Sequence, residues 1–577
     1  MKKKLLPALI VTGLIILVVI IMGITALINK YTPTKKTEDL KEYFNISSDD
    51  EAALIVDNEL SDYKAKIIDK KIYVDYKFVH DSLNSRFYWD ANENVLLYTT
   101  ASDIISAAAD SNSYSVTKQT NDFGYPIVKA TSDSALIALD YVKQYSNITF
   151  KSYDDPARIV ITSKWDEIDS ATVSKSTQVR VKGGIKSPIL KEVKKDDKIT
   201  ILDSGDKWDK VATEDGVIGY IKRKALSESK KTKLTNPDYE EETFTHIKKD
   251  KDICLAWNQV TSQSANNKVP QVISSTKGIN VMSPTWFYLN DNNGNLADIA
   301  SKDYVSYCHS QGIEVWGLFS NLENTDVDAA YVLTHTSTRT TLINQIMSAA
   351  FNYELDGVNI DFENITEAAY GDSYIEFIRE LSIKCHNNGI SLSVDVTVPA
   401  SFNKFFNRSD MAKFADYIVI MGYDEHYKGS DAGSVSSIPW VTEGVESTLK
   451  EVPADQIILG MPFYTRIWEL TPKEDDDAVT DTEDQSKYTV ASQVYSMDAA
   501  AAQLATNNAT AALDEKSGQN YAEWSASNKL YKVWLEDSTS LEKRLKLVDD
   551  NKLAGAAFWK LGFENSSVWD TVIKYLD

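Results

Sequence analysis

Cysteine and histidine are scarce in this chain of 577 residues. Its three cysteines, Cys254, Cys308 and Cys385, stand far apart with no paired spacing, which excludes a disulfide framework. Its six histidines form neither an H-E-x-x-H motif nor a cluster with cysteine. We therefore expect no metal site and no cofactor.

Basic residues are also in deficit, with 61 Lys and Arg against 84 Asp and Glu, giving a net charge of −23. No basic stripe with interleaved aromatics occurs, so nucleic acid is excluded as a partner, and the acidity favours solubility. Apolar residues are plentiful, at 43% of the chain, enough for packed cores. At about 150 residues per domain, the length predicts three or four domains.

One long apolar run stands at the N-terminus. Residues 2–4 are lysines, and residues 5–28 carry no charge. This uncharged stretch is longer than the roughly 20 residues needed to cross a bilayer. Residues 25–30 offer no good small-residue cleavage site, so an uncleaved anchor is favoured over a cleaved signal peptide. The lysines keep the N-terminus in the cytoplasm. We predict a single transmembrane anchor over residues 1–30, with the rest of the chain outside the cell membrane.

Residues 36–165 contain two similar runs, 72–99 and 127–162, each reading strand, helix, strand, turn, strand. Such self-similarity predicts a repeat, here an α+β stalk. The unit resembles the copper amine oxidase N-terminal-like domain of secreted wall proteins, although we find no copper ligands in it. A stalk that holds the following domains off the membrane is favoured over a binding role.

Residues 170–226 read as short strands separated by turns at Gly205-Asp206 and Asp215-Gly216. The run from Gly216 to Ile221 resembles bacterial SH3-type domains, which often bind cell-wall peptide. A small all-β SH3-like barrel is expected, either as a binding module or as a spacer. Residues 227–250, rich in Lys, Glu, Ser and Thr, are expected to be a linker.

Residues 251–577 alternate apolar strands with helical stretches, which predicts βα units and a parallel sheet. Eight such strands close into a (β/α)8 TIM barrel, with catalytic groups at the strands' C-terminal ends. Residues 465–530 are too long for a βα unit, and we expect an insertion that builds one wall of a cleft. The acidic run near residues 473–484 is expected to be a solvated loop. The eight candidate strands are 253–257, 279–283, 313–319, 357–363, 391–397, 417–423, 457–464 and 555–559.

The fourth candidate strand is apolar on one face and polar on the other. Alternation places Asn359, Asp361 and Glu363 on the same face, with the two carboxylates roughly 7 Å apart along the strand. If that face is buried, each carboxylate resists ionisation beside the other, so one pKa rises and a proton donor is available near neutral pH. The alternative is a half-exposed strand with a solvated acidic face.

The stretch Asp356–Glu363 resembles the catalytic strand of glycoside hydrolase family 18, whose pattern is D-G-x-D-x-D-x-E, with Asn359 where the family usually has Asp. Met421–Asp424 resembles the family's M-x-Y-D, Gly460–Tyr464 its G-x-P-x-Y, and Gly555–Trp559 its last strand. The resemblance covers essentially all of 251–577. It is closest to the branch of peptidoglycan and spore-cortex N-acetylglucosaminidases.

The resemblance implies substrate-assisted catalysis, in which the sugar's own acetamido oxygen attacks the anomeric carbon. Glu363 would donate the proton, Asp361 would hold the acetamido N–H and stabilise the oxazolinium ion, and Tyr423 would hold the acetamido carbonyl. Asp424 would contact a sugar hydroxyl, and Trp559 would stack on the pyranose. The resemblance also marks Asn359, Tyr464 and Trp286 as substrate-binding.

Asn359 departs from the family pattern. Asn can hydrogen-bond Asp361 but cannot take its charge, so we expect Asp361 to have one fewer anionic neighbour and a lower pKa.

The sequence predicts a membrane-anchored glycosidase that hydrolyses β-1,4 bonds after N-acetylglucosamine in peptidoglycan or a related glycan. A non-catalytic glycan-binding scaffold on the same barrel is one alternative, but lectin-like relatives typically lose the residue that matches Glu363. A chitinase is the other, and the wall-type stalk argues against it.

Overall fold

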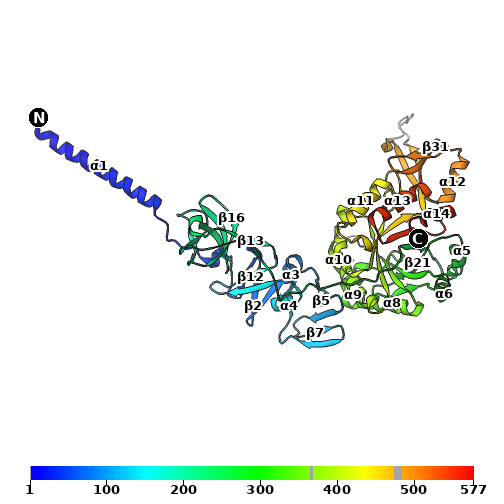
Figure 1. Cartoon of the computed structure of the whole chain (residues 1–577), viewed down its shortest axis with the longest axis horizontal. Coiled ribbons are helices and arrows are strands. Elements are labelled where there is room, and N and C mark those ends of the chain that lie inside the picture. The colour runs from blue at the N-terminus through cyan, green and yellow to red at the C-terminus, as the bar shows by residue number, and fades with distance from the viewer. Residues whose placement is uncertain (1, 364, 366–367, 474–483, 577) are drawn as a thin grey trace. The chain divides into compact units, whose positions relative to one another are not determined.

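The computed structural model describes every residue except 1, 364, 366–367, 474–483 and 577 (Figure 1). The chain divides into two units. The N-terminal unit comprises Met1–Phe87, Ala107–Tyr114 and Asp122–Glu241, and the barrel unit comprises Tyr88–Ser106, Ser115–Asn121 and Glu242–Asp577.

The apolar run at the N-terminus forms one helix, α1 (Lys2–Tyr31). Over Pro7–Tyr31 it is long and apolar enough to cross a membrane, and none of this span is buried. Its exposed leucines, isoleucines and valines have no protein core to enter, so the helix is apolar on every side.

The two predicted runs of residues 36–165 have the same order of elements but different sheet partners. The strands are β1 (Glu51–Val56), β2 (Glu59–Ile68), β3 (Lys71–Asp75), β4 (Phe87–Asp90), β5 (Val95–Thr99), β6 (Ile104–Ala108), β7 (Ser113–Val116), β8 (Gln119–Asp122), β9 (Val128–Ala130), β10 (Ala135–Ala138), β11 (Thr149–Tyr153) and β12 (Arg158–Thr162). The helices are α2 (Leu40–Tyr43), α3 (Tyr76–Ser82) and α4 (Leu139–Tyr145). Strands β11 and β12 join a seven-stranded sheet of order β11-β12-β1-β2-β3-β10-β9, whereas β4 and β5 begin a separate sheet, β4 to β8. Residues 88–106, expected in the stalk, therefore lie in the barrel unit.

A second seven-stranded sheet, of order β15-β14-β18-β17-β16-β13-β19, follows in the N-terminal unit. Its strands are β13 (Glu167–Thr172), β14 (Thr177–Arg180), β15 (Ile189–Val193), β16 (Lys198–Asp203), β17 (Trp208–Thr213), β18 (Ile218–Lys222) and β19 (Lys230–Lys233). Strand β19 lies in the predicted linker. It carries no apolar residue, and polar pairs such as Lys231 with Asp169 hold it to β13, so its sequence lacks a strand pattern.

The two sheets of the N-terminal unit share a core. Ile55 of β1 packs in the same apolar cluster as Val179 and Val211 of the second sheet. Gly216, at φ +82°, lies so close to β1 and β12 that a Cβ would come within 2.8 Å of Val160. The predicted Asp215-Gly216 turn is thus a packing point between the sheets.

The barrel has the eight parallel strands predicted from the sequence, in the order β20-β21-β23-β24-β25-β26-β27-β33, closed by pairing of β20 with β33. They are β20 (Ile253–Asn258), β21 (Val281–Leu289), β23 (Glu314–Ser320), β24 (Gly357–Asp361), β25 (Ser391–Thr397), β26 (Tyr417–Met421), β27 (Ile457–Pro462) and β33 (Gly555–Trp559). The short strand β22 (Leu296–Asp298) pairs antiparallel with β21. The TIM-barrel prediction is confirmed.

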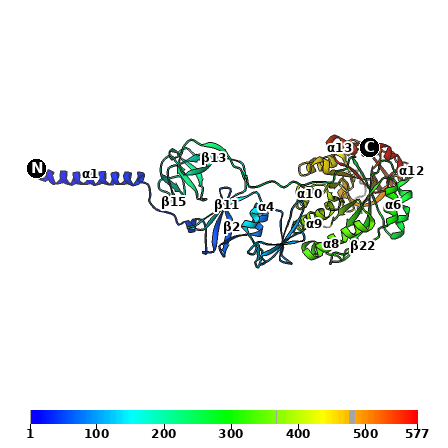
Figure 2. The ribbon, with the colours of Figure 1, turned by 60° about the horizontal axis from the view of Figure 1, so that its bottom comes forward.

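Large side chains fill the barrel and its surroundings, so it is a packed core. Trp257, Trp316 and Val419 belong to the inner cluster, whereas Val358 and Ile360 face outward into the layer under the helices. Figure 2 shows α8, α9 and α10 along the outside of the barrel. The helices of this unit are α5 (Val269–Ile273), α6 (Lys302–Ser310), α7 (Ala329–Thr334), α8 (Thr336–Tyr353), α9 (Ala368–His386), α10 (Arg408–Phe414), α11 (Ile438–Thr448), α12 (Met497–Thr506), α13 (Ser538–Asn551) and α14 (Trp569–Val572).

The predicted insertion after the seventh barrel strand folds as a five-stranded antiparallel sheet with helix α12. Its order is β29-β28-β32-β31-β30. The strands are β28 (Tyr464–Pro472), β29 (Tyr488–Ser496), β30 (Ala512–Asp514), β31 (Gln519–Ala526) and β32 (Lys529–Leu535). Most of the acidic run predicted to be a solvated loop, residues 474–483, lies outside the described residues.

Candidate active site

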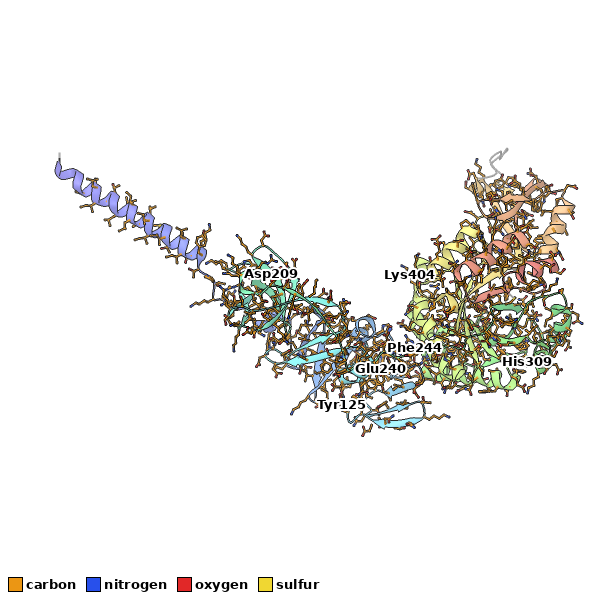
Figure 3. All side chains as sticks on the ribbon, in the orientation of Figure 1. Tyr125, Asp209, Glu240, Phe244, His309 and Lys404 are labelled. Carbon is orange, nitrogen blue, oxygen red and sulfur yellow. The ribbon has the colours of Figure 1, made fainter. Side chains whose placement is uncertain are left out.

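The first two residues of the acidic motif anchor strand β24. Asp356 accepts a hydrogen bond from the Val315 amide at 2.8 Å and pairs with His309 at 2.8 Å. Figure 3 labels His309 on the barrel unit. Gly357 lies against Trp316, and a Cβ there would come within 2.6 Å of the indole. These contacts fix the start of β24 and hence the place of the polar side chains that follow.

Asn359 is fully buried inside the barrel and uses its whole hydrogen-bonding capacity. Its Oδ1 accepts from Trp257 Nε1 and Ser283 Oγ, both at 3.0 Å. Its Nδ2 donates to Ser393 Oγ at 3.0 Å and to Asp395 Oδ1 at 2.7 Å. Our expectation that Asn359 bonds Asp361 is wrong, because an amide has only two N–H donors and both are engaged elsewhere.

Asp361 ends strand β24, and its Oδ1 is buried without a hydrogen-bond partner. Burial first, then the charges of Asp395, Glu363 and Glu323, raise the pKa of Asp361 well above its usual range. The pKa of Asp361 is raised although Asn359 carries no charge, because Asp395 on the next strand supplies an anionic neighbour. That it is lower than it would be beside an Asp at position 359 stays a prediction.

Glu363 lies two residues beyond the strand, and its amide N donates to Asn321 Oδ1 at 3.0 Å. The residue keeps exposed surface, yet partial burial of its carboxyl raises its pKa, assisted by the charges of Asp424 and Glu323. The upward direction agrees with our expectation, although Asp424 and Glu323 rather than Asp361 are the acids responsible. A carboxyl in this environment holds its proton to higher pH and can donate it.

Two aromatic side chains pack against Trp257, and a third packs against one of these two. The ring centroids of Tyr423 and Trp559 lie 6.4 and 6.0 Å from that of Trp257, and both contacts are edge-to-face. Tyr464 packs edge-on against Tyr423 at 6.3 Å. Burial, together with Asp361 and Asp395, raises the pKa of Tyr423 well above its usual range, so its hydroxyl stays a hydrogen-bond donor.

The C-terminal ends of the barrel strands, where Asp361, Glu363, Tyr423 and Trp559 lie, form what we call the mouth of the barrel. The inserted sheet reaches this mouth through its first strand, β28. Tyr464 donates its hydroxyl to Asp424 Oδ1 at 2.6 Å, and Arg466 Nη2 lies 3.4 Å from the same oxygen. Strand β28 therefore holds Asp424 from the side of the insertion. Among the described residues, no group of three His, Cys, Asp or Glu side chains could hold a metal ion.

Residues 318–564 match the model of the Glycosyl hydrolases family 18. The barrel is a family 18 glycoside hydrolase domain. An uncharacterized glycosylase of Bacillus subtilis (strain 168) is 23% identical over 348 residues, which cover 56% of this chain and 95% of that protein. The cortical fragment-lytic enzyme of the same organism is 25% identical over 287 residues, covering 48% of this chain and 63% of that enzyme.

A solved structure, the spore cortex-lytic enzyme SleL of Bacillus cereus, shares the fold. Its TM-score is 0.50 at 18% identity, and the match covers 60% of this chain and 77% of that one. At this identity the likeness speaks for the fold alone.

The family 18 domain does not bring Trp286 to its mouth. Trp286 is fully buried, donates its indole N–H to Asn266 Oδ1 at 2.8 Å, and packs edge-on against Tyr304 at 4.9 Å. Ser283 of the same strand faces the barrel interior, where it bonds Asn359. Trp286 lies at the irregularity of β21 between Thr285 and Phe287, and packs with Phe287 in the core outside the barrel. The prediction that Trp286 binds substrate is corrected: it is a core residue.

Several residues of the mouth were missed by sequence reasoning. They are Trp257, Asn321, Asp395 and Arg466. Asp395 had a signal, because it is the single acid in the otherwise apolar and small-residue strand Ser391–Thr397. Asn321, Trp257 and Arg466 gave none, since each becomes part of the mouth only when distant strands meet.

Proposed function

We propose that the family 18 domain hydrolyses the β-1,4 bond after N-acetylglucosamine in peptidoglycan or a related glycan, with retention and with assistance from the substrate's acetamido group. The observation that carries the proposal is Asp361 Oδ1, a buried acceptor without a protein partner. It lies in the same mouth as Glu363, a carboxyl with a raised pKa. Such an orphaned acceptor suits a substrate N–H.

In this proposal Glu363 protonates the glycosidic oxygen while the acetamido oxygen attacks the anomeric carbon. Asp361 accepts the acetamido N–H and stabilises the positive oxazolinium ion that forms. Tyr423 donates its hydroxyl to the acetamido carbonyl. Glu363, now ionised, then takes a proton from the water that opens the ring, which restores both groups.

The remaining mouth residues bind sugar in this proposal. Trp559, half-buried against Trp257, offers an apolar face to a pyranose. Asp424 accepts from a sugar hydroxyl and is held for this by Tyr464. Asn359 acts indirectly, since its own hydrogen bonds all go to protein groups.

The choice of substrate draws on the curated relatives, whose names include a cortical fragment-lytic enzyme. We further propose that α1 anchors the chain in the cell membrane with the N-terminus in the cytoplasm and the barrel outside. In this scheme the stalk consists of residues 36–165 apart from the segments 88–106 and 115–121, which belong to the barrel unit. Residues 170–226 form an SH3-like module that contacts wall peptide or serves as a spacer.

The deciding experiment compares wild type with Glu363→Gln on purified wall glycan. Loss of the general acid should lower the release of reducing ends by about 10²–10⁴-fold. Glu446→Gln, exposed on α11, is the matched control and should release reducing ends at the wild-type rate. Equal release by Glu363→Gln and wild type would overturn the assignment of the acid.

The products identify the bond. Mass spectrometry of the digest should show N-acetylglucosamine at the new reducing ends. N-acetylmuramic acid at those ends would reject the proposed bond. Cleavage of chitin oligosaccharides with no action on wall glycan would favour a chitinase, and binding without cleavage of either would favour the scaffold.

A further inference from the structure

Asp395 is a buried acid that the proposed steps do not use. It lies on β25 and is 2% exposed. The register of β24 with β25 pairs Asn359 with Ser393 and Ile360 with Val394. Continuing this register by one residue places Asp361 beside Asp395, on strands about 4.8 Å apart, and the charge of Asp395 acts on Asp361.

The groups around this pair are acids or neutral donors. Glu363 acts from the same loop as Asp361, Glu323 from the loop after β23, Tyr423 from the end of β26 and Tyr374 from α9. Burial raises the pKa of Asp395 as well, and the Asn359 amide opposes that rise. Two neighbouring carboxyls in such surroundings cannot both ionise, so they titrate as one system.

Asn359 makes the two acids unequal. It donates an N–H to Asp395 at 2.7 Å and gives nothing to Asp361. A hydrogen bond to a carboxylate favours its charged form, so in the free site the negative charge settles on Asp395 and the proton on Asp361. A substrate N–H at Asp361 would reverse the preference.

We propose that Asp395 is a positioning residue that shares one proton with Asp361. On substrate binding, which rests on the proposed function, the proton leaves Asp361 for Asp395. Asp361 then carries the charge that faces the oxazolinium ion, and the net charge of the pair stays at −1. Asn359 thus serves to hold Asp395 rather than to act on substrate.

The first test is the pH dependence of kcat/KM for the full chain in detergent, comparing wild type with Asp395→Asn. The pH dependence of kcat/KM reports the free enzyme, in which the pair must carry its single negative charge, so the acidic limb follows the first ionisation of the pair. In Asp395→Asn that ionisation must come from Asp361, which receives no hydrogen bond from Asn359, so the limb should move to higher pH by about one unit. Ser393→Ala removes a partner of Asn359 without removing charge, and its limb should stay at the wild-type position. An unmoved limb in Asp395→Asn would leave Asp395 a purely structural residue.

The second test needs no substrate, so its outcome is independent of the proposed function. Both acids have folded-state pKa values above the unfolded value near 4. The unfolded chain therefore loses these protons first as pH rises, and the folded state is penalised increasingly from about pH 4 through the folded pKa values.

The Tm of Asp395→Asn, relative to wild type, should accordingly rise between pH 4 and pH 7. Asp361→Asn is the reciprocal variant and should show the same trend. A Tm difference that does not change with pH in either variant would overturn the shared proton. If Asp395→Asn does not fold, the Asp361→Asn curve decides alone.

Discussion

In the helices α8, α9 and α10 outside the barrel, which we call the outer wall, buried carboxylates pair with arginines. At the mouth, buried carboxylates lie next to one another instead. Arg379 on α9 binds Glu376 at 3.0 Å and also pairs with Asp410 of α10. Arg339 of α8 binds Glu380 at 2.8 Å. All of these side chains are almost completely buried.

The mouth is built differently. Asp361 has an unpartnered oxygen, and Asp395 takes its hydrogen bond from an amide rather than a cation. A guanidinium fixes its carboxylate in the charged state, because removing either partner leaves an isolated buried charge. Without that partner a carboxyl can change protonation during a reaction, which is how acid–base sites differ from structural ion pairs.

Breaking the outer wall should have the largest effect on stability. Arg379→Ala removes the buried cation that pairs with Glu376 and Asp410, leaving Asp410 the half-exposed Lys413. It should lower the free energy of unfolding by about 3–5 kcal/mol, measured by urea denaturation. Lys413→Ala removes only a half-exposed partner of Asp410 and should cost less than about 1 kcal/mol. Equal losses in the two variants would contradict the importance of the buried pairing.

Adding an acid at the mouth should change the pH dependence of activity and of stability, because the side chains that bond Asn359 are neutral or acidic rather than cationic. Asn359→Asp places a carboxyl beside Asp395, where it raises the pKa values of its neighbours. The acidic limb of kcat/KM should move to higher pH. Because the added folded-state pKa is also raised, the variant should lose stability relative to wild type as pH rises above about 4. A pH profile like that of wild type would refute this account of Asn359.

The smallest expected effect lies where strand β5 meets the outer wall. Thr99 is fully buried and donates its hydroxyl to Glu376 Oε1 at 2.8 Å. Thr99→Val should cost about 1.5 kcal/mol in the free energy of unfolding while kcat of the folded enzyme is unchanged. Thr120→Val, exposed on β8, should change stability by less than about 0.5 kcal/mol. A Thr99→Val variant as stable as the control would show that this hydrogen bond contributes nothing.

Local pattern sufficed for the barrel but not for the contacts inside it. The eight strands were predictable because strands buried on both faces are continuous apolar runs. Asp361 and Glu363 were predictable as candidates because acids are rare in such runs. The partners of Asn359 were not, since Trp257, Ser283 and Asp395 come from three other strands and meet only in the closed barrel.

Trp286 is a case in which resemblance to a motif misled. It lies beyond the strand predicted at 279–283, and the pairing of β21 with β23 is irregular between Thr285 and Phe287, so no local alternation gave its direction. The assignment of β4 and β5 to the stalk failed for a physical reason. Thr99 bonds Glu376 and Tyr88 bonds Ser373 of α9, and contacts between residues so far apart in the chain leave no signal in the local sequence.

Residues 88–106 have a consequence for how this enzyme can be divided. Tyr88 stacks over Arg339 at 5.0 Å and bonds Ser373 at 2.9 Å, while Asp90 accepts from the Thr336 amide at the start of α8. A fragment starting at residue 242 would expose the ion-pair layer that these side chains cover. The hydrolase domain therefore cannot be separated by cutting the chain at the linker before residue 242, because residues 88–106 would be lost from its surface. A stable fragment must contain both residues 88–106 and the chain from residue 242 onward.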